Sequence, residues 1–248
     1  MSLLKNLTSD ESIANERDSV GGGGVLDSGL YKPTVSLAYL TKADSGAVGL
    51  VLNLKTEEGR EIRQTIYMTS GTAKGGQNFY TDKDGKKQYL PGFLIANSLA
   101  LLTVGKEISE LDTETKVVNV YQKAAKAEVP TKVEMLVELL GKEILVGLIK
   151  QTVDKTAKNE STGQYDPTGE TRDENEIDKL FRASDRMTTA EIRAQATEAA
   201  FANTWEVKHK GNTRNKAKGA GAAGTAAAPR SSRRASGAWP TTPRRTRT

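Results

Sequence analysis

Three runs of alternating apolar and polar residues, separated by glycine-containing turns, dominate residues 31–69 of this 248-residue chain. In the first, "YKPTVSLAYL", Val35, Leu37 and Tyr39 fall on one face. The second, "VGLVLNL", and the third, "REIRQTIYMT", alternate in the same way after the turns "DSG" and "EEG". A period of two residues is typical of strands with one buried face, and short turns join neighbouring strands. The pattern therefore predicts a three-stranded antiparallel meander.

The third run also assigns a solvent-facing side to the meander. Ile62, Ile66 and Met68 share one face and are predicted to enter the core. Because successive side chains of a strand point to opposite faces, Arg63 and Tyr67 are expected on the outer side.

Beyond the meander, the pattern predicts a helix and then two strands with a short helix between them. The first helix fits "FLIANSLALLTVG" and ends at Gly105. The strands fit residues 116–122 and 143–153, and the short helix fits "KVEMLVELLG". Three strands, a helix and two strands follow the order of an OB fold, a five-stranded Greek-key barrel. The expected fold class is therefore mainly β with helices (α+β), built on an OB-fold barrel.

The chain is expected to divide into four parts. Residues 1–30 form an N-terminal arm with a glycine-rich joint at "VGGGG", and residues 31–155 form the OB-fold domain. Residues 156–206 form a polar loop and a helical extension, in which "TTAE" fits a capping box. Residues 207–248 are of low complexity and are expected to form a disordered basic tail.

The net charge of +5 is unevenly distributed between the body and this tail. Residues 207–248 hold 11 Lys and Arg and no Asp or Glu, so residues 1–206 hold the other 25 basic residues and all 31 acidic ones. The body is therefore acidic, with a net charge of −6. The positive total indicates a basic tail and not a basic binding domain.

Composition argues against several catalytic chemistries, against metal sites and against a membrane or secreted location. The absence of cysteine excludes disulfides, thiolate metal sites and cysteine nucleophiles. The one histidine, His209, lies in a polar basic stretch, which argues against histidine-based catalysis and zinc binding. No apolar run reaches the length of about 18 residues that a membrane helix needs, and the N-terminus lacks a signal-peptide pattern. We therefore expect a cytoplasmic protein with no catalytic activity, no cofactor, no metal and no membrane partner.

The segment "GGQNFYTDKDGKKQYLPGF" places aromatic rings and ammonium groups among turn signals. Its "DKDG" predicts a hairpin turn. The alternative, a calcium-binding loop, fails because the glycine and the distal glutamate that such a loop needs are misplaced. Proteins that hold single strands stack bases on aromatic rings and follow the phosphates with Lys and Arg. The alternative is that the rings pack this segment against the barrel. The predicted nucleic-acid-binding residues are Arg63, Tyr67, Lys74, Phe79, Tyr80, Lys83, Lys86, Lys87 and Tyr89.

Four stretches of the chain resemble a known family. They are "ESIANERDSVGG…LDSGLYKPTVSLAYL", "LPGFLIANSLALLTVGKEISEL", "AEVPTKVEMLVELLGKE" and "TGETRDENEIDKLFRASDRMTTAEIRAQ". Together they look like the single-stranded DNA-binding proteins of tailed bacteriophages, over about residues 1–215. The resemblance implies an OB-fold protein that coats single-stranded DNA without sequence specificity during phage DNA replication and recombination. Phage replication proteins would be further partners, in the cytoplasm of the host cell.

The chain departs from that family at its end. Such proteins commonly finish in an acidic tail that recruits partners, whereas the tail here is rich in arginine. A shift of reading frame near residues 220–228 is one hypothesis for this difference.

Two other functions stay open at this point. The acidic body also suits a structural or scaffold phage protein that acts through protein–protein contacts. A cluster of carboxylates could instead hold Mg²⁺ for phosphodiester hydrolysis, as in two-metal nucleases, although such sites usually draw their ligands from separate elements. The cluster consists of Glu170, Asp173, Glu174, Glu176 and Asp178.

Overall fold

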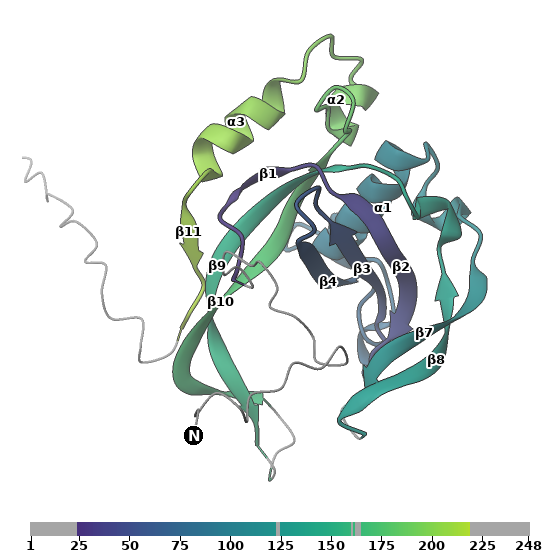
Figure 1. Ribbon diagram of the computed structural model, residues 1–248, viewed down its shortest axis with the longest axis vertical. Coiled ribbons are helices and arrows are strands. Elements are labelled where there is room, and N and C mark those ends of the chain that lie inside the picture. Colours follow the sequence, from purple (N-terminus) through teal and green to yellow (C-terminus); the bar gives the residue numbers. More distant parts are fainter. Residues whose placement is uncertain (1–23, 123–124, 160, 162–164, 219–248) are drawn as a thin grey trace, which may run out of the picture.

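The structure is a computed structural model that describes residues 24–122, 125–159, 161 and 165–218. It is mainly β with a few helices, which confirms the expected fold class at this coarse level. Figure 1 shows two large sheets beside each other, with two helices of the C-terminal part at one end.

The larger sheet has five strands, and all of its pairings are antiparallel. Its strands, in spatial order, are β4 (Glu61–Tyr67), β3 (Val48–Lys55), β2 (Thr34–Lys42), β8 (Ala127–Met135) and β7 (Glu114–Gln122). The order β2–β3–β4 confirms the predicted meander. Ile62, Ile66 and Met68 are buried whereas Arg63 and Tyr67 are exposed, so the predicted faces of β4 are also confirmed.

One predicted face in β2 is wrong. A bulge between Val35 and Leu37 changes the register of β2 against β3. Val35 therefore enters the main core, whereas Leu37 and Tyr39 lie on the opposite face with Val51. An extra residue in one strand moves the following side chains to the other face, which strict alternation cannot foresee.

The second sheet is built around a long hairpin. Its strands are β9 (Leu145–Lys158), β10 (Tyr165–Phe181), β1 (Gly29–Tyr31) and β11 (Thr213–Asn215). β1 pairs with β9 in antiparallel and β11 pairs with β9 in parallel orientation. The expectation of a polar loop at the start of residues 156–206 is therefore wrong, because β9 and β10 pair there and cross the predicted domain boundary at residue 155.

The first predicted helix is confirmed and the second is wrong. α1 (Pro91–Thr103) ends shortly before Gly105, whose φ of 82° favours glycine. Residues 132–141 were expected to be helical, but most of them belong to β8 and to the 3₁₀ helix η4 (Val137–Leu139). β8 pairs with β7 along its whole length, and such pairing overrides local helix propensity. No helix in the described part of the chain has the length and apolar character that crossing a bilayer requires.

The predicted C-terminal helix is divided into α2 (Thr189–Arg193) and α3 (Ala200–His209). The capping box is confirmed, because the side chains of Thr188 and Glu191 each accept a hydrogen bond from the other residue's backbone N–H. The chain then turns at Gln195, whose φ of 53° is incompatible with a continuous helix.

The predicted start of the disordered tail at residue 207 is wrong, because α3 continues to His209 and β11 follows it. The rest of the predicted tail, residues 219–248, lies outside the described residues. The N-terminal arm and its joint lie outside them up to residue 23.

The main core lies between the two sheets and α1. Leu50, Leu52 and Leu54 of β3 are fully buried there together with Val146 and Leu148 of β9. Burial of such side chains is the dominant stabilising term for the fold.

A second apolar cluster fixes α3 to the other face of β9. Trp205 is 3% exposed, and its ring lies edge-on to Phe181 at a centroid distance of 6.3 Å. Gly147 leaves room for this ring, since a Cβ there would come within 2.9 Å of it. The C-terminal helix is therefore an integral part of the folded body.

The two sheets approach each other without closing into one barrel within the described residues. Thr34 and Glu143 form an isolated antiparallel bridge. Elsewhere the Ile177 N–H donates to Oε1 of Gln64 at 2.8 Å, which joins β10 to β4. The five-stranded OB-fold barrel is not confirmed by these pairings.

Candidate nucleic-acid interface

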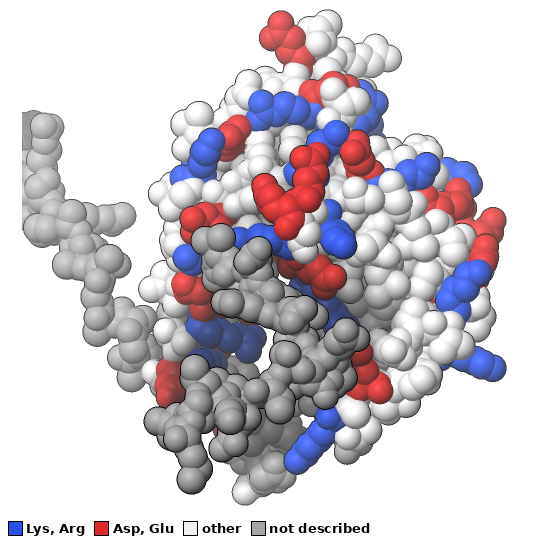
Figure 2. All heavy atoms as spheres, viewed as in Figure 1, with Lys and Arg blue, Asp and Glu red and all other residues white. Residues whose placement is uncertain are grey.

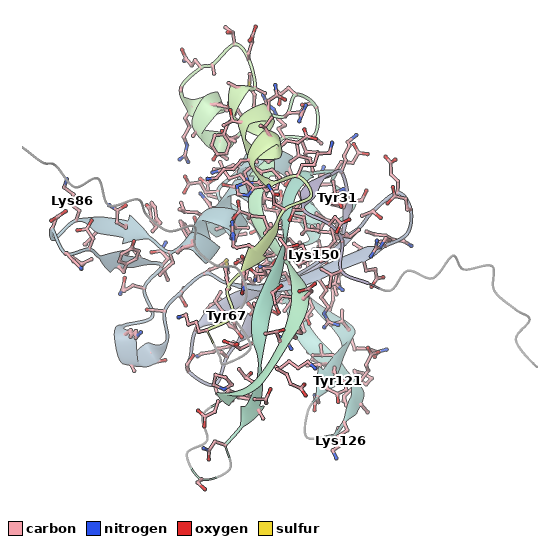
Figure 3. The ribbon with its side chains drawn as sticks, turned by 90° about the vertical axis from the view of Figure 1, so that its left-hand side faces the viewer. Tyr31, Tyr67, Lys86, Tyr121, Lys126 and Lys150 are labelled. Atoms are coloured by element: carbon pink, nitrogen blue, oxygen red, sulfur yellow. The ribbon has the colours of Figure 1, made fainter. Side chains whose placement is uncertain are left out.

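The aromatic and basic segment forms a hairpin that projects from the body. β5 (Phe79–Thr81) pairs with β6 (Lys87–Tyr89), and Figure 3 shows Lys86 near its tip. The predicted turn at "DKDG" is confirmed, because the Gly85 N–H donates to the Asp82 carbonyl at 3.1 Å. Gly85 has a φ of 77°, a value that turns of this kind reserve for glycine.

The Asp82 carboxylate organises this turn. Its Oδ1 accepts hydrogen bonds from the backbone N–H groups of Lys86, at 2.8 Å, and Asp84, at 3.0 Å. The Lys86 hydrogen bond is the largest cause that lowers the pKa of Asp82 from its ordinary value of 3.8. The carboxylate is therefore ionised at neutral pH and holds the lysine-bearing tip in one conformation.

The base of the hairpin is tied to the meander and to itself. The Val48 N–H donates to Oγ1 of Thr69 at 2.9 Å, and the Ser70 N–H donates to the Gln77 carbonyl at 2.8 Å. The 3₁₀ helix η2 (Thr72–Lys74) follows Gly71, where a Cβ would come within 2.9 Å of the Ser45 carbonyl. The segment therefore rests directly on the β2–β3 turn.

A groove of about 900 Å³ lies between this base and the hairpin. Tyr67, Lys74, Phe79 and Tyr80 line it, so the fold brings together four of the nine predicted residues. Tyr67 and Tyr80 are each 49% exposed, which leaves ring surface open to a ligand. Other wall residues come from the β2–β3 turn, from the segment after β4 and from the first turn of α1, so no local motif could have indicated them. They include Ser45, Thr69, Ser70, Gly71, Gln77, Pro91 and Gly92.

The remaining basic residues of the predicted set lie outside the groove wall. Lys83, Lys86 and Lys87 are exposed on the turn and on β6, and Arg63 is exposed on the same face of β4 as Tyr67. The Lys87 Nζ lies 4.7 Å from the centroid of the Phe79 ring, a cation–π arrangement.

Tyr89 lies on the other side of the hairpin from Tyr80. Tyr89 is directly opposite Phe79 in the β5–β6 ladder, whereas Tyr80 is opposite Gln88, so the two tyrosines face opposite ways. The Tyr89 ring contacts Phe93 of α1 at a centroid distance of 4.9 Å. The predicted rings therefore do not form one continuous platform, and Phe93, which was not in the predicted set, belongs with Tyr89.

Charges on the body are mixed. Figure 2 shows Lys and Arg interspersed with Asp and Glu on the face in view. Within the described residues, ion-paired lysines lie away from the hairpin, for example Lys32, Lys106 and Lys155, each within 2.9 Å of a Glu carboxylate. The hairpin lysines Lys83, Lys86 and Lys87 are exposed and can meet an external anion, as can exposed lysines elsewhere on the body such as Lys55 and Lys132.

The carboxylates of the nuclease alternative lie along β10 and not in a loop. Asp178 accepts hydrogen bonds from Nε1 of Trp205 at 2.8 Å and from Arg214 at 2.9 Å, and Glu176 lies 2.7 Å from Nζ of Lys216. Burial pushes the pKa of Asp178 upward, but these hydrogen bonds outweigh it and the pKa falls below 3.8. Glu176 and Asp178 therefore hold α3 and β11 against the β9–β10 hairpin.

No group of three His, Asp or Glu side chains in the described residues is arranged to hold a metal ion. The groove is the candidate site with the clearest ligand chemistry, because it joins exposed aromatic rings to a lysine. Comparison with family models, with curated proteins and with solved structures found no match to this chain.

Proposed function

We propose that this protein binds single-stranded DNA without sequence specificity, through the groove and the β5–β6 hairpin. The observation that carries the proposal is the combination of two half-exposed tyrosines and a lysine in one groove, beneath a hairpin with three exposed lysines. Each base that stacks on an aromatic ring contributes about 1–3 kcal/mol, whatever its identity, and lysines follow the phosphates.

The arrangement of the elements supports an OB-like scaffold for this site. The meander β2–β3–β4 is followed by α1 and finally by β9 and β10, which is the chain order of an OB fold. The Thr34–Glu143 bridge and the Gln64–Ile177 hydrogen bond lie where such a barrel would close. The β7–β8 hairpin, between α1 and β9, is an addition to that plan.

A single strand fits the site better than a duplex does. In a duplex the bases already stack on one another, so they have no free face for Tyr67 or Tyr80. The acidic body, net −6 over residues 1–206, also disfavours binding that depends on phosphates alone. Because the chain also resembles the single-stranded DNA-binding proteins of tailed bacteriophages, we propose that it coats single strands during phage DNA replication and recombination. It would act in the host cytoplasm, with phage replication proteins as partners.

The test is to measure binding of a labelled oligo(dT) and of a duplex of equal length. Both measurements are made on the full chain and on a chain that ends after Lys218. The shortened chain keeps every described element and lacks the arginine-rich segment. We expect the shortened chain to prefer the single strand clearly. Equal affinity for the two nucleic acids would refute the proposal.

A matched pair of tyrosines then locates the site. Tyr67 is 49% exposed in the groove, whereas Tyr121 is 55% exposed on the β7–β8 hairpin, at a distance from the groove that Figure 3 shows. Tyr67→Ala is expected to weaken oligo(dT) binding by about 1–3 kcal/mol, whereas Tyr121→Ala binds like the parent. Equal losses in the two variants would place the site elsewhere.

A further inference from the structure

The ring of Tyr67 lies against a glycine of the neighbouring strand. Gly49 and Tyr67 are directly opposite in the β3–β4 ladder. A Cβ at position 49 would come within 3.2 Å of Cδ1 of Tyr67 and within 3.3 Å of the Thr41 and Thr65 methyl groups. These distances are shorter than ordinary contacts, which begin at 3.4 Å. Gly49 thus leaves the space in which the ring lies.

The backbone of Gly49 does not itself require glycine. Its φ lies outside the left-handed region, so an alanine or valine could adopt the same conformation. A glycine inside a strand costs stability and often marks a place of close approach. Here the approaching group is the tyrosine that lines the groove.

The main chain of Tyr67 is fixed in a similar way from another side. A Cβ at Gly92, in the first turn of α1, would lie 2.0 Å from the Tyr67 carbonyl oxygen. α1 therefore packs directly on the end of β4. The backbone of Tyr67 contacts Gly92, and its ring contacts Gly49. Gly92 also lines the groove.

We propose that Gly49 is a positioning residue of the nucleic-acid site, because it leaves the space that the Tyr67 ring occupies beside β3 and so sets where the ring is presented to a base. The inference rests on the proposed function. Tyr67 is 49% exposed, so ring surface remains open to a base while the ring occupies this space. Holding a ring in its bound orientation lowers the entropy lost on binding, so its position matters as well as its presence.

The test is a double-mutant cycle on the full chain, with binding of labelled oligo(dT) and the melting temperature as readouts. Tyr67→Ala is expected to weaken binding roughly 5- to 150-fold, the equivalent of about 1–3 kcal/mol. Gly49→Val, which fills the space of the ring, should cause most of that loss, and Gly49→Ala a smaller loss in the same direction. In the Tyr67→Ala background neither change at position 49 should weaken binding further. Gly24→Ala is the matched control, because a Cβ at Gly24 meets nothing within 4 Å.

The outcomes separate the inference from the function on which it rests. If Tyr67→Ala weakens binding but Gly49→Val binds like the parent, the inference is wrong and the proposed function stands. Equal losses from Gly49→Val in both backgrounds would also overturn it, because they would indicate a general structural effect. If Gly49→Val does not fold, Gly49→Ala decides by the same comparison. If Tyr67→Ala binds like the parent, the proposed site itself is wrong.

Discussion

Replacement of Lys83, Lys86 and Lys87 by glutamine should reduce the salt dependence of DNA binding. The three side chains are exposed on one hairpin, so all three charges can meet phosphates. On a single strand each neutralised phosphate contributes about 0.7 to the slope of log affinity against log salt concentration. Three contacts therefore contribute about 2, so that between roughly 50 and 200 mM salt the parent should lose about 20-fold more affinity than the variant.

The assay is the dissociation constant of labelled oligo(dT) at a series of salt concentrations, with the chain ended after Lys218. A control variant carries glutamine at Lys32, Lys106 and Lys155. It loses the same total charge, but from lysines that are each already paired with a Glu carboxylate. The Lys87 ammonium also contacts the Phe79 ring, so the melting temperature of each variant is measured alongside. The control should keep the slope of the parent. An unchanged slope in the hairpin variant would show that the hairpin does not contact the phosphates.

Tyr80→Ala should weaken oligo(dT) binding by about 1–3 kcal/mol without lowering the melting temperature. Phe79→Ala, at a partly buried site, should instead lower the stability by about 2 kcal/mol in thermal melts. The reverse result would make Phe79 the stacking residue and Tyr80 the packing residue. The lowered pKa of Asp178 means that its contribution to stability is present above the ordinary value of 3.8 and is lost as pH falls through the lower folded-state pKa. The melting temperature of the parent should therefore fall more steeply than that of Asp178→Asn below about pH 4, and parallel curves would contradict this assignment. In the chain ended after Lys218, tryptophan emission comes from Trp205 alone, which lies in α3 and is 3% exposed, so oligo(dT) should bind without changing the emission. A large quench would place the ligand near α3.

The parts of the fold that could be predicted from the sequence are those in which the pattern is local. β4 alternates because its neighbours in the sheet bury one of its faces, and Ile62 and Tyr67 fall on the expected sides. The "DKDG" turn and the capping box at Thr188 are each specified within a few residues. Patterns of this length need no knowledge of the rest of the chain.

β10 could not be predicted because its stabilising contacts are distant in sequence. Eight of its 17 residues are charged. Glu176 and Asp178 pair with Arg214 of β11, which lies 38 and 36 residues further along the chain. A strand whose faces carry ion pairs lacks apolar alternation and resembles a solvated loop. The bulge in β2 is a second case, since no feature of the sequence specifies where the extra residue falls.

The candidate site, like the fold, could be predicted from the sequence only where its features are local. The rings and lysines of the hairpin are visible in the sequence because they lie within a short segment. The contact between Gly49 and Tyr67 depends on the register of two strands, and the groove wall depends on the contact between the 43–47 turn and η2. Sequence alone therefore identified candidate residues but not which of them share a surface.

The pairing of β9 has a consequence for how the protein is made. β9 is flanked on one edge by β10 and on the other by β1 and β11, which lie near the two ends of the described chain. During synthesis β1 leaves the ribosome first, whereas Thr213–Asn215 are among the last of these residues to do so. Until then the edge of β9 that β11 covers has no partner, and contacts so distant in sequence form slowly. The nascent chain therefore passes through a stage with an open strand edge, which exposes it to pairing with other chains before folding is complete.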